Sequence, residues 1–146
     1  MRDGKSREYP QLTLTAAVRT ADVSGTGVDR TLYDAQEITH ILLMGAGGIT
    51  FDSTNKIEVV MEESDDDSTY TAVAQKDCIV DNGVTVTSGI VKAFTAAHAT
   101  ATAYSFGYRG NKRYSRLKLD FSGTHGTGTA TAALAMHGAA KFAPAA

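Results

Sequence analysis

The stretch Tyr114–Phe121 alternates between polar and apolar residues, and this alternation constrains the fold more than any other feature of the chain. Successive side chains of a β-strand point to opposite faces. One face carries Leu117, Leu119 and Phe121, and the other carries Tyr114, Arg116, Lys118 and Asp120. The pattern therefore predicts a strand with one face in a hydrophobic core and the other in water or against a partner.

A second alternating segment precedes this strand. Tyr104, Phe106 and Tyr108 share one face, and the polar link Arg109–Lys112, which contains a glycine, follows them. Short polar links with glycine are typical of hairpin turns. We therefore predict that Ala103–Phe121 forms a β-hairpin with a row of aromatic side chains on its first strand.

Other short segments of the same kind are separated by turns rich in Gly, Asp and Asn. The further candidate strands are Leu12–Arg19, Val28–Leu32, Ile38–Met44, Lys56–Ser64, Tyr70–Ala74, Cys78–Val80, Val84–Thr87, Ile90–Phe94 and Thr129–His137. Asp65–Ser68 and Asp81–Gly83 each join two of them and predict two more hairpins. The turns recur at about the 8–12-residue spacing of sandwiches and barrels, without long helical patterns between strands. The predicted fold is an all-β, single-domain, antiparallel β-sandwich, jelly-roll-like in its connections.

The alternation also predicts which side chains share a face in the first and last strands. The first strand places Leu12, Leu14, Ala16 and Val18 on one face, and the last strand places Leu134 and Met136 in register. The length of 146 residues fits one domain with a real core. We expect a polar N-terminal arm at residues 1–11, which lies against a neighbouring subunit, a sandwich domain at 12–138 and a C-terminal tail at 139–146.

Charge and composition exclude several classes of protein. The net charge is −2 and no block of basic residues is present, so a nucleic-acid partner is not expected. No apolar run approaches the roughly 20 residues of a membrane span, and Met1–Pro10 is too polar for a signal peptide. Cys78 is the single cysteine and lies in an apolar stretch, where we expect it to be a small buried hydrophobe. We expect a soluble protein made in a cytoplasm.

The residues that most often carry chemistry are scattered, and we predict no enzyme activity, no cofactor and no metal site. His40, His98, His125 and His137 are widely separated, without zinc-site spacing, and solvated or core roles are favoured over ligation. No nucleophile motif is present. Gly45–Gly48 lacks the spacing of a phosphate-binding loop.

Two acidic groups leave an alternative open. Asp65–Asp67 is favoured as a solvated turn, with cation binding as the alternative, because it lacks the pattern of an EF-hand loop. Glu58 and Glu62 share one face of a strand, and a pair of carboxylates that cleaves glycosidic bonds is the alternative, but solvated strand charges are the favoured interpretation.

Two segments carry a family resemblance. Ile57–Asp77 contains an acidic strand, a Ser-Asp turn, an aromatic residue and Thr, and Phe106–Thr124 contains the second motif. That motif consists of Gly107, Tyr108, Arg109, Gly110, Lys112, Arg113, Tyr114 and Arg116, and an Ala-rich last strand follows it. Together the segments, which cover less than half of the chain, resemble small tailed-bacteriophage head proteins of β-sandwich type, the capsid decoration or cement proteins.

The resemblance implies a virion structural protein. Such a protein is made in the bacterial host cytoplasm, binds the outer surface of an assembled capsid and stabilises it. Its partner is the major capsid protein, and it is expected to be a homo-oligomer, a trimer. Neither nucleic acid nor membrane is an expected partner.

The candidate contact residues are Tyr108, Arg109, Arg113, Tyr114 and Arg116, because aromatic residues and Arg dominate interface hot spots. An ordinary half-exposed surface is the alternative for these side chains. The alternative functions are a carbohydrate-binding β-sandwich with Tyr104, Phe106 or Tyr108 as stacking surface, and a receptor-binding head or tail accessory protein. The absence of Trp counts against the carbohydrate function.

Overall fold

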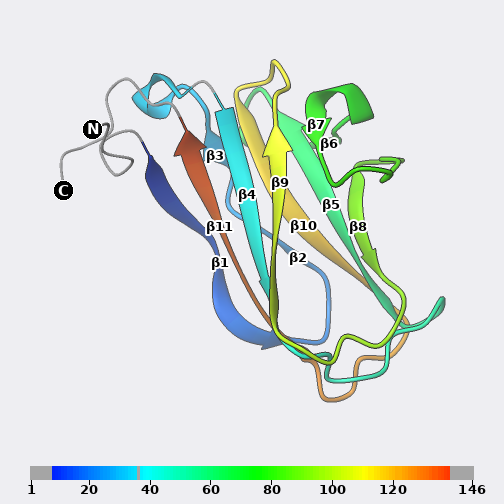
Figure 1. Cartoon of the computed structure of the whole chain (residues 1–146). Coiled ribbons are helices and arrows are strands. Elements are labelled where there is room, and N and C mark those ends of the chain that lie inside the picture. Colours follow the sequence, from blue (N-terminus) through cyan, green and yellow to red (C-terminus); the bar gives the residue numbers. More distant parts are fainter. Residues whose placement is uncertain (1–7, 36, 139–146) are drawn as a thin grey trace.

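The computed structural model describes residues 8–35 and 37–138, which form two antiparallel β-sheets packed face to face (Figure 1). Sheet A contains, in spatial order, β1 (Tyr9–Arg19), β11 (Thr129–Gly138), β4 (Glu37–Met44), β9 (Thr102–Tyr108) and β7 (Cys78–Ile79). Sheet B contains β2 (Val23–Ser24), β10 (Tyr114–Ser122), β5 (Lys56–Ser64) and β6 (Thr71–Ala72), with β3 (Val28–Asp29) on β10 and β8 (Ile90–Phe94) on β5. Two single 3₁₀ turns, Leu32–Asp34 and Gln75–Asp77, complete the elements. The prediction of an all-β antiparallel sandwich is confirmed, and the jelly-roll connectivity stays a prediction.

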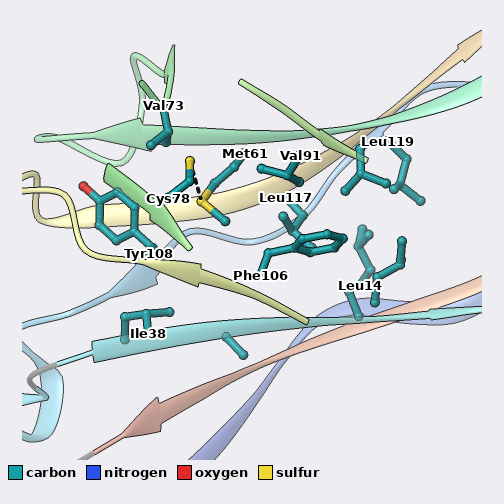
Figure 2. Packing of buried hydrophobic residues seen from close by; sticks show 14 of the residues in the cluster. Leu14, Ile38, Met61, Val73, Cys78, Val91, Phe106, Tyr108, Leu117 and Leu119 are labelled. Atoms are coloured by element: carbon teal, nitrogen blue, oxygen red, sulfur yellow. Dashed lines mark hydrogen bonds between the residues drawn. The ribbon is translucent and has the colours of Figure 1, made fainter. Parts of the chain in front are cut away.

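The core lies between the sheets and follows from the alternation along each strand. Its large side chains come from β4, β9, β5, β8 and β10, and include Leu42, Ile57 and Val59. Figure 2 shows others of this core, among them Ile38, Phe106, Met61, Val91, Leu117 and Leu119. The predicted core face of β10 is confirmed for Leu117 and Leu119, while Phe121 is partly buried against the core. Cys78 is buried as predicted, with its Sγ 3.9 Å from the Met61 Sδ.

The predicted hairpin at Ala103–Phe121 is wrong. β9 pairs with β4 and β7 in sheet A, whereas β10 pairs with β5, β2 and β3 in sheet B. The link Arg109–Arg113 therefore crosses from one sheet to the other (Figure 1). The apolar faces of the two strands oppose each other across the core. Two strands of a hairpin would show the same alternation of polar and apolar residues in the sequence.

The other two predicted hairpins have different outcomes. β5 and β6 pair with Glu62 opposite Ala72, so the hairpin with the acidic turn is confirmed. The turn at Asp81–Gly83 forms, since the Val84 amide donates to the Asp81 carbonyl at 3.1 Å and Gly83 has a φ of +87°. However, β7 pairs with β9 instead of with Val84–Thr87, so this turn does not join a hairpin.

The face assignment of the first strand is also wrong, because β1 contains two register shifts against β11. Leu12 lies opposite Leu134, and Leu14 lies opposite Ala133, so two residues of β1 match one of β11. Leu14 consequently points into the core and Leu12 points away from it. β1 begins at Tyr9, so the last residues assigned to the arm belong to the sheet. The remaining arm, residues 1–7, and the tail, 139–146, lie outside the described residues.

Candidate functional site: the two outer faces of the sandwich

The outer face of sheet B is the charged face, and it contains the alternating polar residues that the sequence predicts. Its outward side chains on β5 and β10 are Lys56, Glu58, Val60, Glu62, Tyr114, Arg116, Lys118 and Asp120. Arg116 Nε contacts Glu62 Oε2 at 2.8 Å, and Lys56 Nζ contacts Glu58 Oε1 at 2.7 Å. These charges are thus paired within the chain.

Tyr108, one of the five predicted contact residues, does not lie on an exposed surface. Its side chain is only 2% exposed, because β9 belongs to sheet A and Tyr108 faces the core. Its hydroxyl donates to Glu63 Oε2 at 2.7 Å and accepts from the Lys112 amide at 3.1 Å. Burial and the bond to Glu63 raise the pKa of Tyr108 above its usual value. Tyr108 therefore anchors the crossing link instead of contacting a partner.

The other four predicted contact residues lie outside the core and make internal contacts. Arg113 contacts Asp29 at 2.7 Å and lies 5.0 Å from the ring centroid of Tyr114. Arg116 lies 3.7 Å from the centroid of Tyr70. Arg113, Tyr114 and Arg116 thus gather at the start of β10.

Arg109 is separate from that group. Its Nε donates to the Lys76 carbonyl at 2.8 Å, and its amide donates to the Asp77 carbonyl at 3.0 Å. These bonds tie the crossing link to the 3₁₀ turn before β7. Arg109 therefore holds two loops together through hydrogen bonds.

The outer face of sheet A is of the opposite kind, and we call it the apolar face. Its outward residues are Pro10, Leu12, Val18, Thr39, Ile41, Leu43, Ile79, Ala103, Ser105, Ala130, Ala132, Leu134 and Met136. Leu12, Val18, Ile79 and Leu43 are 62, 65, 54 and 45% exposed. None of these outward residues is charged, and Glu37 at the end of β4 marks the rim.

The cross-strand register makes the apolar face continuous. Leu12 lies opposite Leu134, which lies opposite Ile41 on β4. Ala132 lies opposite Leu43, which in turn lies opposite Ala103. Apolar side chains therefore adjoin one another across four strands, unlike the singly scattered apolar residues of an ordinary surface.

One end of the apolar face is hollowed. The hollow has a volume of about 370 Å³, and its walls consist mainly of alanines, Ala16, Ala17, Ala101, Ala103, Ala130 and Ala132, with Leu43 beside them. Small side chains on β1, β11 and β9 leave space that larger ones would fill. The hollow is a consequence of the alanines that are frequent in β11 and its neighbours.

The sequence did not predict the apolar face, because hydropathy does not mark the buried side of the end strands. In β11 the buried positions are Thr129, Thr131, Ala133, Ala135 and His137, while Leu134 and Met136 alternate with them on the outer side. The signal was present in β4, where Ile38 and Leu42 alternate with Ile41 and Leu43. A strand that is apolar on both faces indicates that both faces are covered.

Two of the four histidines lie on the inner side of sheet A. His40 is fully buried, and its Nε2 is 2.9 Å from Ser115 Oγ. Burial, with repulsion from His137, lowers the pKa of His40 to about 4. His137 is buried beside Tyr9 and Tyr33, and burial lowers its pKa. Of the two predicted roles, solvated or core, both side chains have the core one.

The other two histidines support loops. His98 bridges the Gly45 carbonyl and the Tyr104 hydroxyl, each at 2.9 Å, and His125 Nε2 is 2.9 Å from the Ser122 carbonyl. Within residues 8–35 and 37–138, no three His, Cys, Asp or Glu side chains are grouped closely enough to hold a metal ion.

The acidic turn after β5 is organised by its own backbone. Asp66 accepts hydrogen bonds from the Thr69 amide at 2.8 Å and the Ser68 amide at 3.0 Å, which lower its pKa to about 2. The Ser64 hydroxyl also donates to Asp66, at 2.8 Å. These bonds hold the turn together, and cation binding at Asp65–Asp67 stays the open alternative.

Comparisons with known proteins add no functional assignment. No protein-family model matches the chain, and a search of curated proteins finds no match. No helix in the described part of the chain is long and apolar enough to span a membrane. The functional proposal therefore depends on the two outer faces and on the motifs of the sequence.

Proposed function

We propose that this chain is a virion structural protein, a decoration or cement protein that attaches to the outer surface of an assembled capsid. The observation that carries the proposal is the apolar face, which is typical of a chain that is a subunit of a larger assembly. Leaving apolar surface in water costs about 25 cal/mol per Å² relative to burying it. Contiguous exposed apolar patches are therefore typical of surfaces that bind other proteins.

The sequence motifs support the same proposal from the other sheet. Ile57–Asp77 and Phe106–Thr124, which resemble segments of phage head proteins, are far apart in sequence, but their strands β5 and β10 pair along their whole length. The strands β5 and β10 of the resemblance thus form one structural unit, the charged face, while Gly107 and Tyr108 of the second motif lie on β9 of sheet A. In this proposal Arg113, Tyr114 and Arg116 on that unit contact the major capsid protein.

The carbohydrate-binding alternative loses its main support. Phe106 and Tyr108 are buried, and Tyr104 is partly buried with its hydroxyl beside His98. A sugar needs the exposed face of an aromatic ring for stacking, and these rings do not form such a platform. No contact in the described chain favours the receptor-binding alternative.

The test is co-sedimentation of the purified chain with capsid shells of the phage that encodes it, prepared without the chain. We expect saturable binding to shells and reduced binding of Arg116→Ala. Lys76→Ala is the matched control, because it removes a positive charge from an exposed position away from the charged face. A wild-type chain that stays in the supernatant at every concentration contradicts the proposal.

A further inference from the structure

We propose that the apolar face binds the apolar face of a second copy of this chain, so that two sandwiches pair about a two-fold axis. The inference rests on the proposed function in one respect, since it treats the chain as a subunit of an assembly. It names the occupant of the apolar face and leaves the charged face free for another partner. The family resemblance implies a trimer instead, so the two arrangements can be distinguished by mass.

Charge favours a copy of the chain as the partner. In a two-fold contact the same patch on both subunits forms the interface. A patch with charges would bring like charges together or bury ion pairs, which is costly. Apart from Glu37 at the rim, the outward residues of the apolar face include no Asp, Glu, Lys or Arg, so a copy meets little such cost there. The charged face, with the Arg116–Glu62 and Lys56–Glu58 pairs, is less suited to such a contact.

Shape favours the same partner. One part of the apolar face carries Leu12, Leu134 and Met136, and the hollow occupies the other end, with Val18 and Leu43 at its border. Consider a two-fold axis that lies between the two apolar faces and is perpendicular to the strands. This axis places the end of one copy that has the larger side chains over the hollowed end of the other copy. Leu12 is then opposite the alanines of its partner, and the contact occurs twice.

The hollow has room for the side chains that this pairing brings to it. Its volume is about 370 Å³. A buried cavity of about 150 Å³ already accommodates a benzene ring. Leu134 and Ala132 are two residues apart on β11, about 7 Å along the strand. An axis that crosses β11 between these two residues therefore places Leu134 of one copy over the hollow of the other.

The size of the face fits a stable pair. Four strands of about eight residues, at about 4.8 Å between strands and about 3.3 Å per residue, cover a footprint of about 500 Å². Side-chain relief makes the accessible area larger than this flat footprint. Specific interfaces bury about 800 Å² on each partner. Face-to-face packing of two sheets is also the arrangement that forms the core of this sandwich.

A small apolar ligand is a weaker occupant of the hollow. Ligand sites place a few convergent polar groups that orient the molecule. The hollow is bordered mainly by alanines, with Leu43 and Met44 beside them. Such walls bury an apolar side chain of a partner well but give a free ligand no fixed orientation.

The test is sedimentation equilibrium of the full chain over a range of concentrations. We expect a reversible dimer, and we expect Leu12→Glu and Ala132→Lys each to raise the dissociation constant at least about 100-fold, because each buries an unpaired charge. Mixing the two variants is expected to restore association by at least about 10-fold, since one contact then pairs the opposite charges. Val60→Glu is the matched control on the outer side of β5, and thermal unfolding verifies that every variant is folded.

Each outcome shows whether the apolar face binds a second copy of the chain. A wild-type chain that is monomeric at the highest soluble concentration overturns the inference, as does a trimer, or a dimer that Leu12→Glu leaves intact. A monomer whose binding to capsid shells is abolished by Leu12→Glu gives the face to the capsid protein, which overturns the inference and supports the proposed function. A dimer that Leu12→Glu disrupts, but that never binds shells, supports the inference and contradicts the proposed function.

Discussion

The two outer faces of the sandwich differ although the same alternation builds both. On β10 the outward residues are charged or aromatic and the inward ones include Leu117 and Leu119, so apolar area is concentrated in the core. On β11 the outward residues include Leu134 and Met136, whereas the inward ones are Thr, Ala and His. Sheet A thus divides its apolar side chains between two faces. The outward set adds little to the fold of an isolated chain, which is why we propose a partner for that face.

The largest expected effect is a difference in unfolding free energy between truncation of an inward leucine and truncation of an outward one. Leu119→Ala should lower the free energy of unfolding by about 2–5 kcal/mol, because Leu119 is fully buried and its truncation leaves a cavity. Leu12→Ala should lower it by less than about 0.5 kcal/mol, since that side chain is 62% exposed. Urea unfolding, at a concentration where the chain is monomeric, measures both. Equal losses would mean that the outward face of sheet A also stabilises the monomer.

The second effect is a loss of stability at low pH, and it comes from two buried histidines of sheet A, His40 and His137. Burial holds the pKa of His40 at about 4, below the unfolded value of 6.5, so the unfolded chain binds more protons between these values. Stability is therefore fully present above pH 6.5 and is lost as the pH falls toward 4, by about 3 kcal/mol for this group. His137, whose pKa burial also lowers, adds to the loss.

His40→Gln tests the acid effect. Glutamine does not titrate in this range and keeps a hydrogen-bonding group toward Ser115, which is 2.9 Å from His40 Nε2. We expect the variant to be less stable at neutral pH but to show a shallower loss of unfolding free energy between pH 6.5 and 4. Urea unfolding at a series of pH values measures the slope. An unchanged slope would show that His40 is not the source.

The sequence predicted those parts of the fold that depend on alternation within one strand. β5 and β10 have large apolar residues at every second position, so their inner and outer faces were clear, as was the sandwich class. Pairing between strands was not predictable in the same way. A hairpin and a crossing between sheets give Phe106 and Leu117 the same alternation, and only the three-dimensional structure distinguishes them.

The candidate surface was harder to predict for two physical reasons. The register shifts in β1 interrupt the period of two, so Leu12 and Leu14 fall on opposite sides although they are two residues apart. In β11 the packed positions hold small or polar residues, so hydropathy points to the wrong face. Burial of Tyr108 has the same origin as the wrong hairpin, because a residue of sheet A was assigned to the surface of sheet B.

The smallest expected effect lies on the charged face. Arg116→Ala should lower the free energy of unfolding by about 1 kcal/mol, because it removes the ion pair with Glu62 and the contact with the Tyr70 ring. Lys118→Ala is the matched control, since Lys118 Nζ lies 3.8 Å from Asp120 and should contribute close to nothing. Part of the Arg116 effect should disappear at high salt, which screens partly exposed charges. Urea unfolding at low and high salt measures this difference. An Arg116 variant that is as stable as the control would leave that side chain without a structural role on the charged face, and its place beside Tyr114 would then be explained better by contact with a partner.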